Sequence, residues 1–366
     1  MKLVKILSVI FFVAIQSANL FSQRIEIISE EVLIDNLPLN IKFSFVNEDS
    51  IFISPNQFDN QSDYSLERYT NAGLLELTHT HEKAGSERII NNRYQVYLAK
   101  NNKLIVNDLK KKNHKVIDIS VSLPIRIWDL NEATNSIVIS QQNEKGEKEL
   151  LSLDLQNGKS KFIDIGVGGE WNSQGEKLIF RGLSEENIHP GIRFRNGDID
   201  EQEYEHLMKQ GAPPAIWKIS NQNFSYKLDI SEFTSANRVL WSPDGEYLIV
   251  SDLKKGEYIL EIGEENNRPV ILNKKKILDP GIEVNYPIWS PDSKYVVYCL
   301  YELDERGNSY ISTEITLFDH NAQKQRIYIN NDIIISDLIW NEPNAIIAVK
   351  QNHQDDIKQI IKFNIK

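Results

Sequence analysis

The stretch WSPDGEYLIV, from Trp241 to Val250, sets the period of this sequence because it recurs in related form along most of the chain. Pro243 fixes a backbone dihedral of a turn, Asp244 supplies a hydrogen-bonding side chain, and Gly245 can adopt positive φ. After the turn, apolar residues occupy alternate positions of a segment that can be covered on both faces. The stretch therefore predicts a β-hairpin whose first strand ends at Trp241.

Related hairpin sequences begin at three other tryptophans: WNSQGEKLIF at Trp171, WSPDSKYVVY at Trp289 and WNEPNAIIAV at Trp340. All four units place apolar residues seven and nine positions after the tryptophan. Three earlier units repeat the strand pattern with different spacing or a different anchor residue. The anchors are, in chain order, Phe45, Ile89, Trp128, Trp171, Trp241, Trp289 and Trp340.

Four strand candidates in each unit, at a period near 45 residues, are typical of a β-propeller, in which sheets pack radially around a central channel. We expect one all-β domain over residues 23–366 with seven four-stranded blades, six and eight being the alternatives. The anchor residues would lie between neighbouring blades. The last unit has three strand candidates, and RIEIIS (Arg24 to Ser29) has no partner nearby. We therefore predict that the N-terminal strand completes the last blade and closes the ring.

The tryptophan segments resemble the WD-like repeats of TolB-like periplasmic proteins and of the propeller domains of prolyl-oligopeptidase-type enzymes. The motif resemblance runs from Trp128 to the C-terminus, whereas Ile25 to Ser120 agrees by strand pattern. The resemblance implies a propeller and leaves the chemistry open, because one fold hosts many functions. TolB-like proteins usually have six blades and an added N-terminal α/β domain, and neither feature is expected here. No counterpart of the hydrolase domain of the prolyl-oligopeptidase-type enzymes is expected either.

Residues 1–22 have the features of a signal peptide: Lys2 and Lys5 precede an apolar run from Ile6 to Ile15. That run is well short of the ~20 residues that a membrane-spanning helix needs. The single cysteine, Cys299, excludes an intramolecular disulfide and lies far from the cleavage region where a lipid would be attached. We expect a soluble periplasmic or secreted protein that neither spans the membrane nor carries a lipid anchor.

The charge balance argues against nucleic acid as a partner. The chain has 41 basic and 52 acidic residues, for a formal net charge of −11. Proteins that bind nucleic acid concentrate positive charge to neutralise phosphates.

A helical insertion at residues 183–214 in the fourth unit is the largest departure from the repeat. Asp198 or Asp200 can cap a short helix there, and Pro213 and Pro214 end it. The insertion joins a second strand to a third, so it should share one face with loops in other units, and long loops often bind ligands. We predict a ligand site on this loop face with the helix as a lid. Its candidate residues are His189, Arg193 and Arg195 in the insertion, and His79, His81 and Asp304 in neighbouring loops.

Two alternatives to this site remain open. The helix can simply cover apolar sheet ends while its charges are solvated. His79 and His81 can lie in a surface loop, because two ligands from one short loop do not complete a metal site. We expect no metal and no cofactor.

The sequence contains no G-x-S-x-G nucleophile motif and no glycine-rich phosphate loop, so we assign no catalytic residue. Cys299 lies in a strand that is apolar on both faces, which favours a buried, unreactive thiol. The leading hypothesis is an exported, non-enzymatic propeller that binds a protein, peptide or glycan partner through its loop face. The alternatives are a carbohydrate-active propeller enzyme, a lyase or hydrolase, and a scaffold in a cell-envelope complex.

Overall fold

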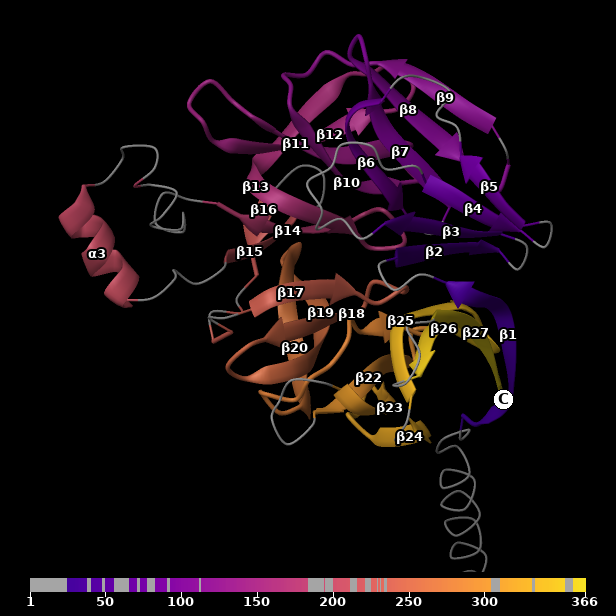
Figure 1. Cartoon of the computed structure of the whole chain (residues 1–366). Helices are drawn as coiled ribbons and strands as arrows, with labels where there is room; N and C mark the ends of the chain where they lie inside the picture. The colour runs from indigo at the N-terminus through magenta and orange to yellow at the C-terminus, as the bar shows by residue number, and fades with distance from the viewer. Residues whose placement is uncertain are drawn as a thin grey trace, which may run out of the picture.

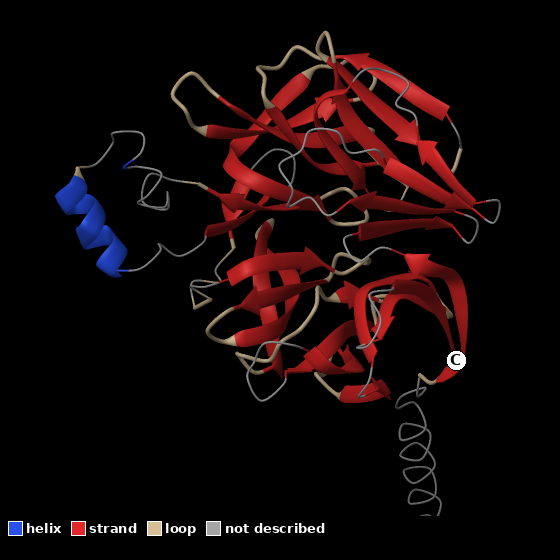
Figure 2. Ribbon diagram, in the orientation of Figure 1, coloured by secondary structure: helices blue, strands red, loops and turns tan. Residues whose placement is uncertain are grey.

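The computed structural model is built almost entirely of β-strands (Figures 1 and 2). It describes residues 25–37, 41–47, 50–55, 66–70, 73–77, 83–90, 93–111, 113–183, 194, 200–210, 216–220, 225–228, 230, 232–233, 236–303, 310–330, 333–352 and 358–366. The predicted signal peptide at residues 1–22 lies outside these ranges. No helix within them is both long and apolar enough to cross a membrane.

The described strands form six antiparallel sheets that follow one another in chain order around the molecule (Figure 1). The first sheet contains β2 (Ile41–Asn47), β3 (Ser50–Pro55), β4 (Leu66–Thr70) and β5 (Gly73–Leu77). The second contains β6 (Lys83–Ile90), β7 (Tyr94–Ala99), β8 (Lys103–Asp108) and β9 (Asn113–Asp118).

The next sheet has seven strands because one long strand belongs to two repeat units. It runs through β10 (Ile125–Asn131), β11 (Ser136–Gln142), β12 (Lys148–Asp154), β13 (Ser160–Trp171), β14 (Leu178–Gly182), β15 (Ile216–Ser220) and β16 (Ser225–Lys227). The first half of β13 pairs with β12, and its second half pairs with β14. The fourth strand of the third unit thus continues into the first strand of the fourth unit.

Three further sheets complete the arrangement. One contains β17 (Ala236–Trp241), β18 (Tyr247–Asp252), β19 (Gly256–Glu265) and β20 (Arg268–Leu278). The next contains β21 (Ile288–Trp289), β22 (Tyr295–Leu303), β23 (Tyr310–Asp319) and β24 (Lys324–Asn330). The last contains β25 (Ile333–Glu342), β26 (Ala345–Asn352), β27 (Lys358–Ile365) and the N-terminal strand β1 (Ile27–Leu37).

The hairpin predicted at Trp241 is confirmed, because β17 pairs with β18 in a register that places Trp241 opposite Leu248. In the turn, the Ser242 hydroxyl accepts a hydrogen bond from the Tyr247 N–H at 2.9 Å. Gly245 adopts a φ of 73°, and a Cβ there would lie 2.8 Å from the Asn172 side chain, so the turn requires glycine. The anchor predicted at Trp128 is wrong, because the register places Leu130 opposite Ile137, as Trp171 lies opposite Leu178 and Trp241 opposite Leu248. Leu130 is buried at the anchor position, and Trp128 lies at a β-bulge between Ile127 and Asp129.

Buried apolar side chains lie between successive sheets rather than in one central core. One cluster joins the second sheet to β10–β12, and another joins β11 and β12 to β14. Three more clusters lie between β14–β15 and β17–β19, between β18–β20 and β21–β23, and between β22–β23 and β25–β27. The molecule is therefore a stack of face-packed sheets arranged as in a propeller.

Strand β1 pairs with β27, from Ile27 opposite Ile365 to Leu37 opposite Lys358. The predicted strand, Arg24 to Ser29, is too short and starts too early: β1 begins at Ile27 and extends to Leu37. The acidic pair Glu30 and Glu31 does not end the strand, because β1 is an outer strand with one side open to solvent. The chain ends are also joined by reciprocal backbone hydrogen bonds between Glu26 and Lys366.

Helix α3 (Glu201–Gln210) lies within the predicted insertion and apart from the sheets in the view of Figure 1. Asp200 caps it, since the Asp200 carboxylate accepts the Glu203 N–H at 2.8 Å. Tyr204 stacks on Phe194 with ring centroids 4.9 Å apart.

Candidate functional site

Polar side chains from different sheets meet along the first strands. Contacts between first strands link successive units, because β6 contacts β10, β13 contacts β17, and β21 contacts β25. Strand β2 of the first sheet likewise contacts β25 of the last sheet. Residues on these strands therefore gather on the inner side of the arrangement, where the channel of a propeller lies.

Two arginines from neighbouring first strands lie over one indole ring. Arg126 of β10 places its guanidinium carbon 4.6 Å from the centre of the Trp128 ring, and Arg88 of β6 lies 6.0 Å from the same ring. The indole N–H donates to the Ser140 hydroxyl at 2.9 Å, which fixes the orientation of the ring. Both arginines are exposed, whereas Trp128 is half-buried. A guanidinium group over an aromatic ring is attracted by the negative face of the ring.

A third arginine lies over an aromatic ring two repeat units further along. The guanidinium carbon of Arg238, on β17, lies 3.2 Å from the ring centre of Tyr286, which precedes β21. Tyr286 is 68% exposed, the largest exposed fraction among the aromatic residues of the described ranges. Within the described part of the chain, Arg88, Arg126 and Arg238 take part in no ion pair. We call these three residues, with Trp128 and Tyr286, the axial arginine set.

Two carboxyl groups lie behind this set and link successive sheets. Asp129 is buried, and its two carboxylate oxygens accept the N–H groups of Leu130 and Trp171, each at 2.8 Å. Burial raises the pKa of Asp129 to about 6, against the lowering effect of these two hydrogen bonds and of Arg88. The Trp171 N–H belongs to the next unit, so Asp129 fastens the third unit to the fourth.

Glu170 repeats this link one unit later, since its carboxylate accepts the Trp241 N–H. Burial, followed by the charge of Asp129, raises the pKa of Glu170 to about 8. The side chain nevertheless retains accessible surface. Arg88 shows the same combination, because it is exposed while desolvation is the largest cause lowering its pKa. Both side chains thus retain surface that water can reach.

A third carboxyl group, Glu257 of β19, is occupied by hydroxyl donors. It accepts hydrogen bonds from Ser251 at 2.6 Å and from Tyr298 at 3.1 Å. Burial raises the pKa of Glu257 despite these bonds and the nearby charge of Arg238. The carboxyl groups of this region are thus engaged by the protein, and the groups left open to a ligand are guanidinium groups and aromatic edges.

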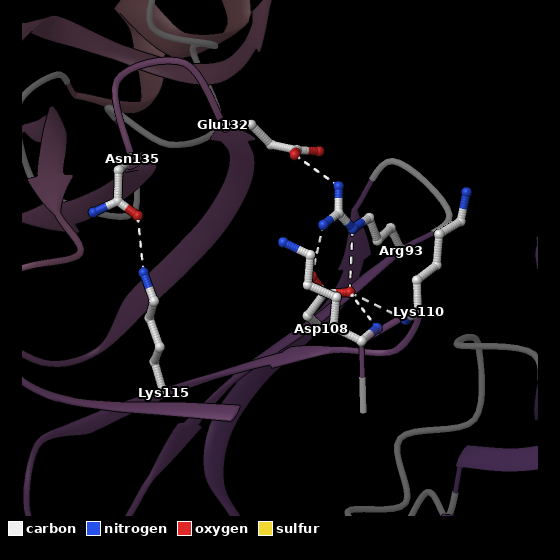
Figure 3. Close-up of polar contacts among 7 residues, drawn as sticks. Arg93, Asp108, Lys110, Lys115, Glu132 and Asn135 are labelled. Atoms are coloured by element: carbon white, nitrogen blue, oxygen red, sulfur yellow. Dashed lines mark hydrogen bonds and ion pairs between the residues drawn. The ribbon is translucent and has the colours of Figure 1, made fainter. Parts of the chain in front are cut away.

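A separate pocket of about 200 Å³ lies between the second and third units, next to turns that join first to second and third to fourth strands. Arg93 contacts Asp108 through two nitrogens, at 2.7 and 3.1 Å, and Glu132 through a third at 2.8 Å (Figure 3). Burial would raise the pKa of Asp108, but hydrogen bonds from Arg93 and from two backbone N–H groups outweigh it and lower that pKa. Because these charges pair with one another, we interpret this network as a structural link between sheets.

The candidate ligand residues from the sequence lie outside the described ranges. These are His79, His81, His189, Arg193, Arg195 and Asp304. The anchors Trp171, Trp241, Trp289 and Trp340 are 5–9% exposed and lie in clusters between sheets. Phe45 lies in β2, and its side chain is not described. Within the described residues, no group of three or more histidine, cysteine and acidic side chains could hold a metal ion.

Sequence reasoning missed the axial arginine set because its members come from four different units. A usable signal was present. Arg126 lies two positions before Trp128, and Arg238 and Tyr286 lie three positions before their tryptophan anchors, in segments otherwise apolar. Charge in a strand covered on both faces indicates a special position.

No family model and no curated protein matches the sequence. Solved structures do match. An oligogalacturonate lyase in complex with manganese aligns with a TM-score of 0.53 and 12% identity over 93% of this chain and 95% of the other. The Cps50 (Swd1) β-propeller domain of Myceliophteria thermophila aligns with a TM-score of 0.50 and 10% identity over 91% and 99%. The chain has a β-propeller fold.

This propeller is also similar to a protein described as TolB from Agrobacterium tumefaciens, with a TM-score of 0.43 and 11% identity over 79% of this chain and 93% of the other. The propeller fold predicted from the tryptophan repeats is confirmed. At 10–12% identity these likenesses concern the fold and carry no ligand or reaction over to this chain.

Proposed function

We propose that this protein is an exported, non-enzymatic β-propeller that binds a protein, peptide or glycan partner at the loop-bearing end of its channel. The observation that carries the proposal is the axial arginine set. Its three guanidinium groups form no ion pair within the described residues, although the chain has a net charge of −11. Arginine, tryptophan and tyrosine are the residues most enriched where binding energy concentrates in interfaces.

The position of the set favours the loop face that the sequence analysis selected. Arg126 and Arg238 lie near the beginnings of β10 and β17, and Tyr286 precedes β21. The first strand of each unit begins at the end of the loop that comes from the fourth strand of the preceding unit. These loops lie on the same face of the propeller as the insertion at residues 183–214. A ligand entering from this face would reach Arg126, Arg238 and Tyr286 first.

We further propose that the sheets make seven blades and that β1 closes the ring. The division of β13 between two units supports seven, since the seven-stranded sheet then counts as two blades. The pairing of β1 with β27 and the contact of β2 with β25 support closure. Export rests on the predicted signal at residues 1–22, and a role within a cell-envelope complex is compatible with it.

A site-specific photocrosslinker tests the binding site. Placed at Tyr286 in the full-length protein and irradiated in the cells that produce it, the crosslinker should yield one discrete adduct. The Arg238→Gln change should reduce this adduct at equal protein level. Leu272 of outer strand β20, which is 58% exposed, provides the matched control position. Equal adducts at Leu272 and Tyr286, or an adduct indifferent to Arg238→Gln, would contradict the proposal.

One observation favours the carbohydrate-active alternative, namely that Glu170 is a carboxyl group with a pKa of about 8 next to Arg88 and accessible to water. Such a group can act as a general acid at neutral pH. Turnover of an acidic oligosaccharide that is lost in Glu170→Gln would establish this alternative in place of the binding function.

A further inference from the structure

We propose that the axial arginine set binds a short acidic peptide segment through two carboxylates, one held by Arg88 and Arg126 and the other by Arg238. This inference rests on the proposed function and names the chemistry of the partner at the same site. It begins from the state of the three arginines, whose guanidinium carbons lie between 3.2 and 6.0 Å from ring centres and which form no ion pair among the described residues.

Stacking prepares each guanidinium group for a carboxylate. A ring under the plane of the guanidinium restricts its rotation, so little side-chain entropy remains to be lost on binding. The N–H donors of a guanidinium group form a fork whose spacing matches the two oxygens of a carboxylate. Trp128 itself is fixed by its bond to Ser140, which extends this order to Arg126.

The arginines occupy two positions around the channel rather than one. Arg88 and Arg126 meet at Trp128, between the second and third units, whereas Arg238 lies between the fifth and sixth units beside Tyr286. Glu170 of the fourth unit lies between these positions in chain order. A ligand with a single carboxylate can satisfy one of them only. An extended peptide carries side chains on one face about every 7 Å, so two acidic residues whose spacing matches the separation of the two positions would occupy both.

Two observations favour a peptide over an acidic glycan. A guanidinium group lies over one face of each aromatic ring, so that face is closed to a sugar. The overall charge of −11 also repels a long polyanion, while a short segment places its carboxylates only where the arginines are.

The neighbouring carboxyl groups offset part of the positive charge of the set, because Asp129 acts on Arg88 and Glu257 lies within reach of the charge of Arg238. Asp129 accepts two backbone N–H groups, and Glu257 accepts two hydroxyl groups. Burial raises the pKa of Glu170 to about 8, which favours its protonated form at neutral pH, so Glu170 offsets little of the charge of Arg88.

Fluorescence anisotropy at low salt provides the test. The probes are labelled peptides Gly-Glu-Gly-Glu-Gly and Gly-Gln-Gly-Gln-Gly with blocked ends, and the protein is the full chain. We expect the glutamate peptide to bind and the glutamine peptide not to. Arg126→Gln and Arg238→Gln should each weaken binding at least tenfold, in line with the loss of a charge-assisted bond. Arg268→Gln is the matched control, because Arg268 also lies over a ring, that of Tyr226, but on outer strand β20.

The outcomes separate this inference from the proposed function. Equal binding of the two peptides, or equal weakening by Arg268→Gln and Arg126→Gln, overturns the inference. Binding of an oligogalacturonate in place of the glutamate peptide also overturns it and identifies a glycan. If the Tyr286 crosslink persists while the peptide fails to bind, the proposed binding function stands and only the acidic peptide is wrong. Unchanged melting curves for each variant show that a loss of binding is not a loss of fold.

Discussion

The Glu170→Gln substitution should make the protein more stable at neutral pH and flatten the dependence of its stability on pH. Glutamine has the same shape as a protonated glutamic acid and keeps an oxygen that can accept the Trp241 N–H. The pKa of Glu170 rises from 4.5 in the unfolded chain to about 8 in the folded protein. The folded state therefore binds the proton more tightly, and stability falls as pH rises from 4.5 towards 8.

The size of the effect follows from this shift. Between pH 5 and pH 7 the unfolded side chain is largely ionised while the folded one is largely protonated, so each pH unit lowers the free energy of unfolding by up to ~1.4 kcal/mol. From pH 5 to pH 7 the free energy of unfolding thus falls by about 2.5 kcal/mol in the absence of screening. Because Glu170 keeps some accessible surface, water screens part of it, and we expect about 2 kcal/mol.

Denaturant unfolding at pH 5, 6, 7 and 8 measures this difference for the wild type and the variant. The gap between their unfolding free energies should widen in favour of Glu170→Gln as pH rises. Glu246→Gln, at an exposed glutamate of the Trp241 hairpin, controls for the loss of one acidic residue and should leave the gap constant. A constant gap for Glu170→Gln, or one that narrows with rising pH, would refute the assigned burial of this carboxyl group.

Three further changes test the packing. Trp241→Ala should lower the free energy of unfolding by about 3–5 kcal/mol, because the ring is buried between two sheets and its removal leaves a cavity. A decrease below 1 kcal/mol in denaturant titration would place the ring at the surface. Deleting Ile27–Leu37 should lower the melting temperature sharply, since β27 loses its partner, and an unchanged calorimetric transition would contradict the pairing. Arg93→Ala should lower the free energy of unfolding by about 1–3 kcal/mol, because it leaves Asp108 without its charged partner. The side chain of Glu132 is 47% exposed, so Glu132→Gln should lower the same free energy by less than ~1 kcal/mol in the same titration.

The repeat units were predictable because each hairpin is a local structure. Turn residues fix where the chain reverses, and the positions seven and nine after the tryptophan then fall on the buried face of the following strand. Leu248 and Val250 are fully buried, as are the equivalent Val296 and Tyr298. The insertion helix was predictable for the same reason, since the Asp200 cap acts within one turn of its own helix.

The limits of sequence prediction appear at the strand ends and at the channel. The N-terminal strand was expected over Arg24 to Ser29, yet β1 runs from Ile27 to Leu37. Its extent depends on β27, which lies more than 300 residues away in the chain, and not on local propensity. Strand β13 likewise belongs to two units because β12 pairs with its first half and β14 pairs with its second half, and local sequence does not fix where these two partner strands end.

By itself, the sequence determined the repeat, the propeller class and four buried tryptophan anchors, because turn chemistry and alternation act over fewer than a dozen residues. These anchors are Trp171, Trp241, Trp289 and Trp340. Only the tertiary structure brought Arg88 and Arg126 to one indole ring, paired Arg238 with Tyr286 and buried the carboxylate of Asp129 against the Trp171 N–H. Each of these contacts joins residues of different units. Their proximity follows from how the sheets pack around the channel, and burial and local charge are properties of that packed arrangement rather than of any segment.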